Sequence, residues 1–180
     1  MIGQLAPAIR PEDLDGFRQA RLLLLLRSLS DLDAPAPDLE RLSFYDFFSA
    51  NPFLVPIEAP IRAALTFAGF ESANLSYQSS SQRFANNRAR LQFDLAILVA
   101  RGLIMPQVHG RRVTYGITED GVSVAGSLRS MYAEAFRTSA KVIVEKLRRL
   151  SDSALRTSAK NWLRAEDLMI DLYEPEGSAP

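Results

Sequence analysis

The side chains of this sequence that could do chemistry are mostly arginines, and several recur at helical spacing. Three polar residues share one face of a helix predicted over 83–101, and two arginines follow at a predicted turn. Side chains placed in this way can contact the phosphates and base edges of nucleic acid. The candidate nucleic-acid contacts are Arg83, Asn87, Arg90, Arg111 and Arg112. An ordinary solvated helix face is the alternative.

The charge of the chain is zero overall but uneven along the sequence. Its 21 basic residues balance 21 acidic residues, which argues against a protein that coats DNA through bulk electrostatics. Residues 82–112 contain six arginines and one acid, Asp94, a local charge of +5, whereas residues 1–60 have a local charge of −4. We expect Asp94 on the same helix face as the arginines. An acidic protein partner would use the same arginines as DNA.

Catalytic chemistry has few candidate residues. The chain has no cysteine and one histidine, His109, which fits a solvated turn better than a catalytic role. Paired carboxylates such as Asp13 and Asp15 have no histidine or phosphate-cradling loop beside them, and neither common nucleotide-binding glycine motif is present. We therefore expect no enzymatic activity, no metal and no cofactor; if ATP is involved, a partner binds it.

Four aromatic residues crowd five positions of a helix that Asp38 is expected to cap and Asn51-Pro52 to end. Four large rings cannot all point inward on one helix, so one or two are expected at the surface or in an interface. Plain core packing is the favoured alternative for most of them. A second stripe, at spacings of seven, lies on a helix predicted over 127–150. The candidate partner-binding residues are Tyr45, Phe47, Phe48, Tyr132, Phe136 and Ile143.

The segment from 83 to 128 must position the arginines. Gly102 is expected to end the first helix, strands are predicted over 103–108 and 112–117, and Thr118 is expected to cap the next helix. This order is typical of a winged helix, which is a docking module. The predicted fold is mainly α with a small β-hairpin: a winged helix-turn-helix followed by a C-terminal helical extension.

The remaining elements divide the chain into three parts. We expect a winged-helix domain with N-terminal helices over 1–126, a C-terminal helical hairpin over 127–173 and a disordered tail over 174–180. The apolar run 22–26 predicts a buried helix and is far too short to span a bilayer. With no secretory signal visible, a cytoplasmic protein is expected. The serine-rich segment 71–81 is expected to form a loop or to order against a partner.

Three segments resemble those of a known protein family. They are Arg41-Leu42-Ser43-Phe44-Tyr45-Asp46-Phe47 with Asn51-Pro52, then Asn86-Asn87-Arg88-Ala89-Arg90-Leu91-Gln92-Phe93-Asp94-Leu95, then Arg101-Gly102-Leu103-Ile104. In this order they resemble the middle component of ABC-type three-component systems. The resemblance implies a small winged-helix protein that bridges a coiled-coil, SMC/Rad50-like ATPase and an effector subunit, as in Lamassu-type antiphage defence. It implies a hetero-oligomer, and the basic residues over 82–112 make double-stranded DNA a further candidate ligand.

A homodimeric winged-helix transcriptional regulator is the alternative function. Such a regulator would use the stripe on the helix over 127–150 as its dimer seam and present two equivalent long helices to a palindromic site. Sequence spacing alone leaves open whether this stripe packs within the chain or against a second subunit. The acidic, aromatic-rich N-terminal half and the polar segment 71–81 favour the bridging function.

Overall fold

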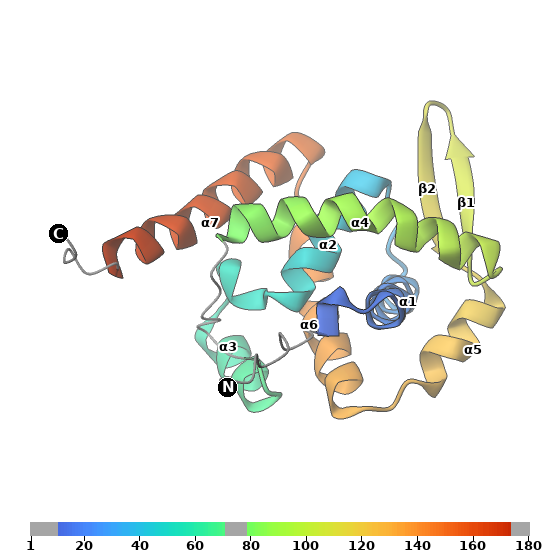
Figure 1. The fold of residues 1–180 in the computed structure, drawn as a ribbon, viewed down its shortest axis with the longest axis horizontal. Helices are drawn as coiled ribbons and strands as arrows, with labels where there is room; N and C mark the ends of the chain where they lie inside the picture. The colour runs from blue at the N-terminus through green and yellow to red at the C-terminus, as the bar shows by residue number, and fades with distance from the viewer. Residues whose placement is uncertain (1–10, 71–78, 174–180) are drawn as a thin grey trace, which may run out of the picture.

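The computed structural model describes residues 11–70 and 79–173, with side chains up to residue 164. The fold is mainly helical, with one two-stranded antiparallel sheet among these residues (Figure 1). Both features were predicted from the sequence. The elements in chain order are η1 (Pro11–Asp13), α1 (Asp15–Asp31), α2 (Leu39–Ala50), η2 (Pro52–Leu54), α3 (Ala59–Phe67), α4 (Ser80–Ala100), β1 (Ile104–His109), β2 (Arg112–Ile117), α5 (Glu119–Ser127), α6 (Met131–Leu147) and α7 (Asp152–Tyr173). The expected tail over 174–180 and most of the expected loop over 71–81 lie outside the described residues.

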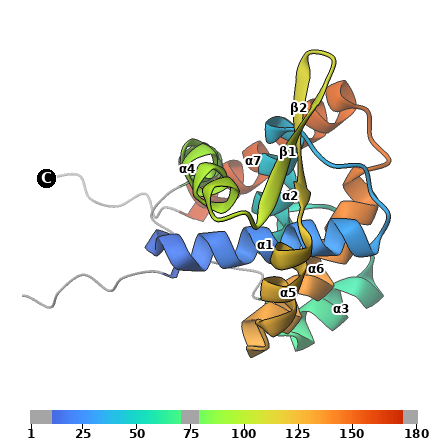
Figure 2. The same ribbon diagram turned by 90° about the vertical axis from the view of Figure 1, so that its right-hand side faces the viewer.

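Helix α1 lies at the centre of the molecule. It contacts α2, α4, α5, α6 and the hairpin strand β2, so it is covered on nearly every side (Figures 1 and 2). The apolar run Leu22–Leu26 is buried at every position, with exposures of 3% or less. Five consecutive leucines would leave apolar surface in water on a helix packed on one face, whereas a helix packed all round hides them. The predicted buried helix is confirmed.

Helix α6 completes the same core. Its apolar stripe packs on α1 and α2, and Phe136, Ile143 and Leu147 are fully buried within the single chain. The helix begins at Met131, later than the predicted start at residue 127, because the Ser130 side chain accepts a hydrogen bond from the Ala133 N–H and caps it. The predicted long helix over 127–150 is therefore wrong at its start, since α5 extends through Ser127.

Helix α7 packs mainly against α4 and η2. Figure 1 shows it running beside α4 and away from the lower end of α6. The Trp162 ring meets the Phe48 ring edge-on, with centroids 5.3 Å apart, and Leu155 and Ala159 are buried beside it. The apolar side of α7 thus joins the core formed by α1, α2 and α6.

The junction between α4 and the hairpin depends on Gly102. The residue adopts a φ of 70°, in the left-handed region that glycine enters without strain. Two hydrogen bonds close the end of α4: the Gly102 N–H donates to the Val99 carbonyl, and the Leu103 N–H donates to the Leu98 carbonyl. This pattern is a Schellman motif, and it turns the chain from the helix into β1. The predicted stop at Gly102 is confirmed.

The start of α5 is fitted against the same junction. The Thr118 hydroxyl accepts a hydrogen bond from the Gly121 N–H and donates one of 2.7 Å to the Gly102 carbonyl. A Cβ at position 121 would overlap the Leu103 carbonyl oxygen and lie 2.8 Å from Ile117 Cγ1. Glycine is therefore required here by space, because only its missing side chain lets α5 approach the base of the hairpin.

We predict that Gly121→Ala destabilises the protein by about 1–3 kcal/mol or more, because backbone of the hairpin base must shift to admit the methyl group. Gly126→Ala is the matched control in the same helix, since a Cβ there meets nothing within 4 Å. It should be neutral or stabilise by no more than about 1 kcal/mol. Urea unfolding of both variants measures the difference. Equal free energies of unfolding would contradict the proposed close fit.

A candidate docking site on the β-hairpin

The hairpin of β1 and β2 projects beyond the helical body. Its residues pair in register from Ile104 with Ile117 to His109 with Arg112, which leaves Gly110 and Arg111 as a two-residue turn. Gly110 has a φ of 62°, as such tight hairpin turns require. Figures 1 and 2, which are at right angles, both show the turn standing clear of the helices. The predicted hairpin is confirmed, with its first strand one residue later than expected.

The two faces of the hairpin differ in polarity. Residues paired across an antiparallel ladder point to the same side, and every second residue along a strand does so as well. One side, which we name the apolar ribbon face, consists of Ile104, Pro106, Val108, Val113, Tyr115 and Ile117. The opposite side carries Met105, Gln107, His109, Arg112, Thr114 and Gly116. The alternation of one apolar and one polar side is typical of a sheet that packs on a core with one face.

The apolar ribbon face extends past the core that covers its base. Ile104 is 2% exposed, and Tyr115 and Ile117 are packed against the core. Val113 is 43% exposed, and its ladder partner Val108 is 74% exposed. The outer half of this face therefore presents apolar side chains to solvent.

A short segment before α2 holds β2 along its outer edge. The Tyr115 N–H donates a hydrogen bond of 3.0 Å to the Pro37 carbonyl, and Asp38 and Thr114 form an isolated antiparallel bridge. The same Asp38 caps α2 by accepting a hydrogen bond from the Arg41 N–H. Asp38 thus connects the N-terminus of α2 with the middle of the hairpin.

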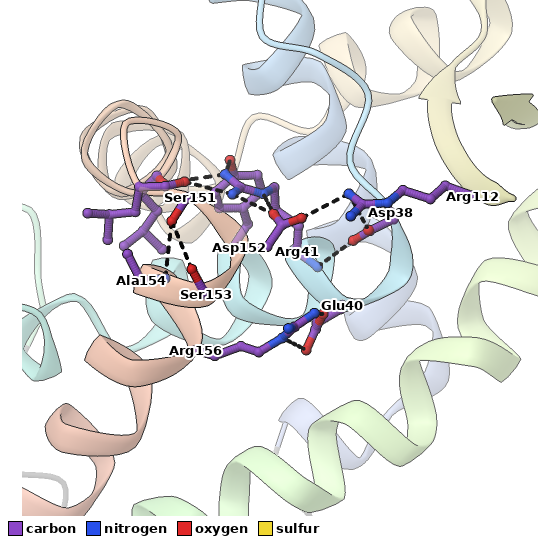
Figure 3. Close-up of polar contacts among 12 residues, drawn as sticks. Asp38, Glu40, Arg41, Arg112, Ser151, Asp152, Ser153, Ala154 and Arg156 are labelled. Carbon is purple, nitrogen blue, oxygen red and sulfur yellow. Dashed lines mark hydrogen bonds and ion pairs between the residues drawn. The ribbon is translucent and has the colours of Figure 1, made fainter. Parts of the chain in front are cut away.

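A charge network fixes the hairpin to the starts of α2 and α7 (Figure 3). Arg112 Nη1 lies 2.9 Å from Asp152 Oδ2 and 3.7 Å from Asp38 Oδ2. Arg41 donates to Asp152 Oδ1 at 2.8 Å, and also to the Leu150 carbonyl at 2.8 Å. Hydrogen bonds from Arg41, and then from Arg112, hold the pKa of Asp152 below its ordinary value. Three segments distant in sequence are thereby joined through one carboxylate.

A second ion pair lies beside this network in Figure 3. Arg156 on α7 donates two hydrogen bonds, of 2.8 and 2.6 Å, to the carboxylate of Glu40 on α2. This bidentate pairing lowers the pKa of Glu40 from its ordinary value. A shallow hollow between α2 and α7 is lined by Asp38, Glu40, Arg41, Phe44, Asp152 and Leu155. Its charged side chains are all engaged in the ion pairs described above, so the hollow is part of the framework.

The structure places four of the five candidate nucleic-acid contacts in intramolecular interactions. Arg83 donates to Asn51 Oδ1 and lies 5.9 Å from the centre of the Phe47 ring. Asn87 donates to Asp46 at 2.8 Å, Arg90 pairs with Asp13 at 2.9 Å, and Arg112 belongs to the charge network. Arg111 is exposed at the hairpin turn. Within the described part of the chain, it has no hydrogen bond or ion pair.

Two buried ion pairs were not found by the sequence analysis. Arg18 on α1 donates to Asp94 on α4 at 2.7 and 3.1 Å, and Asp94 is 2% exposed. Arg21 on α1 makes a bidentate pair with Asp46 on α2, at 2.8 and 2.6 Å, and also donates to Asn87 at 2.9 Å. The alternative of an ordinary solvated helix face is wrong at Asp94, which is buried against α1. It faces inward because the guanidinium of Arg18 is buried beside it.

The candidate partner-binding rings are mostly used by the chain itself. Tyr45, Phe47 and Phe48 are 2%, 3% and 0% exposed, so the expectation that one of the aromatic residues of α2 points outward is wrong. They fit inside because α2 is covered by α1, α4, α6 and α7 together, with Phe84 stacked against Phe44 and edge-on to Phe47, and Trp162 edge-on to Phe48.

Tyr132 differs from the other members of the predicted stripe. It is 38% exposed and stacks between the rings of Phe17 and Phe136, at centroid distances of 4.9 and 5.9 Å. Desolvation of its hydroxyl raises the pKa of Tyr132 to about 12. Phe136 and Ile143 are fully buried and face α1 and α2. The stripe therefore packs within the chain, which decides the alternative left open by its spacing.

The most exposed apolar side chains were not among the predicted site residues. Phe67 and Met131 are 96% and 92% exposed, and Val108 follows at 74%. For Val108 the signal was present, since apolar residues alternate along both strands up to the turn. For Phe67 and Met131 no pattern distinguished them from core residues of α3 and α6.

Comparisons with known proteins identify the family. Residues 20–165 match the family model described as ABC-three component (ABC-3C) system Middle Component 2. The chain belongs to this family. Neither curated proteins nor solved structures gave a match. The match confirms the resemblance to a middle component of an ABC-type three-component system, so the protein works with other components of such a system.

Two further properties concern the described residues alone. None of the helices in 11–70 and 79–173 is both long and apolar enough to cross a bilayer. No group of three or more histidine, aspartate or glutamate residues in those ranges is placed to hold a metal ion.

The charge network should make stability depend on pH in one direction. The pKa of Asp152 is lower in the folded chain than its ordinary value of 3.8, so its contribution is complete above that value and is lost as the pH falls through the folded pKa. We predict that Asp152→Asn lowers stability by about 0.5–1 kcal/mol at neutral pH, since the pair is partly solvated. The difference from the wild-type protein should persist to about pH 5 and shrink below about pH 4.

Thermal unfolding of both proteins across this pH range measures the effect. Glu58→Gln is the control, because this exposed acid lies before α3 and away from the network. A difference between wild type and Asp152→Asn that stays constant down to strongly acidic pH would contradict the stabilising role assigned to the Asp152 carboxylate.

Proposed function

We propose that this chain is a non-enzymatic adaptor that bridges an SMC-like ATPase and an effector within a prokaryotic antiphage defence complex of the Lamassu type. Membership of the middle-component family supports a role alongside other subunits. The buried charged side chains are engaged in structural pairs, such as Arg21 with Asp46 and Arg18 with Asp94. The protein would accordingly act through its surfaces.

We further propose that α4, the hairpin and α5 form a winged-helix module. Support comes from their order and junctions: a long helix closed by Gly102, a two-stranded antiparallel ribbon, and a helix capped by Thr118. In this proposal the ribbon is the wing. A wing that stands clear of the body can reach a partner that the helices cannot touch.

The observation that carries the adaptor function is exposed apolar surface at two separate places. One is the outer half of the apolar ribbon face, with Val108 and Val113. The other includes Phe67 at the end of α3 and Met131 at the start of α6. Both figures show the hairpin and α3 at opposite ends of the molecule. A bridging protein needs two such surfaces, because it must bind two partners at once.

The homodimeric regulator receives less support from the geometry. Its dimer seam was expected along α6, but Phe136, Ile143, Val144 and Leu147 are fully buried against helices of the same chain. A seam already covered by α1 and α2 is not free to bind a second copy.

For DNA, the same reasoning favours the hairpin turn over the long helix. Arg83, Asn87 and Arg90 on α4 would each have to leave an existing partner to bind phosphate. Arg111 would not. We propose that any contact between this subunit and double-stranded DNA is made by Arg111, with DNA affinity resting mainly on the ATPase.

We predict that the chain co-purifies in one complex with both the ATPase and the effector of its own three-component system. Co-expression followed by size-exclusion chromatography with light scattering measures the composition and mass. Purification of the chain alone is the control for self-association. A stable homodimer that retains neither component would contradict the adaptor function and favour the regulator.

A second prediction concerns DNA. If the isolated chain binds a short duplex, Arg111→Ala should reduce the salt dependence of the affinity by about one phosphate contact, a change of about 0.9 in the logarithmic slope. Arg111→Lys should keep the slope, and Arg90→Ala should leave it unchanged because Arg90 is paired with Asp13. Fluorescence anisotropy at several salt concentrations measures the slopes. An equal reduction of the salt slope in Arg90→Ala would show that α4 also contacts DNA.

A further inference from the structure

The apolar ribbon face is longer than the core needs. Its base residues are covered, yet the same alternation of apolar side chains continues through Pro106 and Tyr115 to Val108 and Val113. Exposed valines on a projecting two-stranded ribbon gain nothing from folding, and contiguous exposed apolar side chains are typical of interaction surfaces. The outer half of this face therefore has the character of a surface that another molecule covers.

A ribbon can bind a partner by pairing an edge strand with a strand of that partner, but both edges of this hairpin are poorly suited to such pairing. The β2 edge is already paired with Pro37 and Asp38. The Tyr115 N–H donates to the Pro37 carbonyl, so the backbone polar groups of Tyr115 point away from β1. In an antiparallel ladder the partner of such a residue also points its backbone groups outward, so those of Pro106 face the other edge of the ribbon, along β1. Proline has no N–H to donate, so it removes a donor from the middle of that edge. Binding through side chains remains.

The charge of the hairpin selects the kind of partner. No acidic residue occurs between residues 104 and 117, and Arg111 at the turn is exposed. Arg112 is already paired with Asp152. One unpaired guanidinium neutralises about one phosphate, which is little for nucleic acid, where affinity rises with the number of phosphate contacts. Two exposed valines beside one arginine instead fit a protein surface that is apolar with carboxylates at its border.

The hairpin is held in place before any partner arrives. The Tyr115 hydrogen bond to Pro37 and the pairing of Arg112 with Asp152 and Asp38 connect it to the starts of α2 and α7. A fixed ribbon loses less conformational entropy on binding than a mobile loop would. The network therefore favours docking of the ribbon as a preformed unit.

We propose that Val108, Val113 and Arg111 form a docking site for another protein component of the three-component system, one whose surface offers an apolar groove bordered by carboxylates. This inference rests on the proposed adaptor function and names the hairpin as one of its two binding surfaces. The valines enter the groove, and Arg111 pairs with a carboxylate at its rim.

The test uses the full chain with the purified ATPase component and, separately, the purified effector component of its own system. Biolayer interferometry measures the Kd for the wild type and for Val108→Ser with Val113→Ser. We expect the double variant to lose about tenfold or more in affinity for one of the two components, as central interface side chains commonly do. Arg111→Glu should weaken the same interaction and Arg111→Lys should retain it.

Met105→Ser is the matched control, because Met105 is 50% exposed but lies on the opposite side of the ribbon. It should change the affinity by less than about twofold if the apolar ribbon face alone is buried on binding. Thermal unfolding of every variant should match the wild type, since the substituted side chains are exposed. A variant that unfolds at lower temperature is replaced by Val108→Ser alone, which is the more exposed position.

The outcomes separate the docking site from the adaptor function. If the wild type binds a component and the double variant binds it equally well, the docking site is wrong and the adaptor function stands. If the wild type binds neither component, the adaptor function fails and the docking site fails with it. If the valine substitutions instead turn a dimer into a monomer, or weaken binding to duplex DNA and to no protein component, the occupant is a second copy or DNA and the proposal is overturned.

Discussion

Two arginines on a helix that is buried all round impose the main constraint on this structure. Arg18 and Arg21 are each 6% exposed, and each pairs with a carboxylate supplied by another helix. Asp94 on α4 meets the first, and Asp46 on α2 meets the second. Removing Asp46 would cost about 3–5 kcal/mol, because the Arg21 charge would be left without an ion pair, whereas Arg18 would keep its pair with Asp15 if Asp94 were removed. The pairs therefore fix how α2 and α4 are seated on α1.

The hairpin takes its position from the helix that these pairs hold. Because α4 is fixed by Arg18 and Asp94, its end at Gly102 has a fixed place, and the Leu98 carbonyl bonded to Leu103 starts β1 from there. Helix α5 then closes against the same junction through the Thr118 hydroxyl. The charge network at Asp152 holds the other side of the hairpin. The position of the hairpin therefore depends both on the buried pair of Arg18 with Asp94 and on the surface network at Asp152.

Local patterns in the sequence predicted most helices and strands, but they could not predict which side chains distant in sequence pair with one another. Gly102, Thr118 and the alternation in the strands are local signals, and each was confirmed. The local charge of +5 over residues 82–112 is correct as a sum, but it does not describe a free basic surface. Arg83, Arg90 and Arg112 bind partners that are distant in sequence. The aromatic crowding on α2 was misleading for the same reason, since no local pattern shows that four other helices cover α2.

The segments that carry the family resemblance have a structural explanation that bears on specificity. Asp46, Asn87 and Asp94 lie in the buried pairs or beside them, Arg41 in the charge network, and Gly102 at the helix stop. A resemblance based on such residues is informative about the fold, because their side chains bind other residues of the same chain. These three segments stop at Ile104, whereas the family match spans residues 20–165 and includes the hairpin. Val108, Arg111 and Val113 belong to none of these pairs, so substitutions at these three exposed positions need not disturb the pairs that hold the fold.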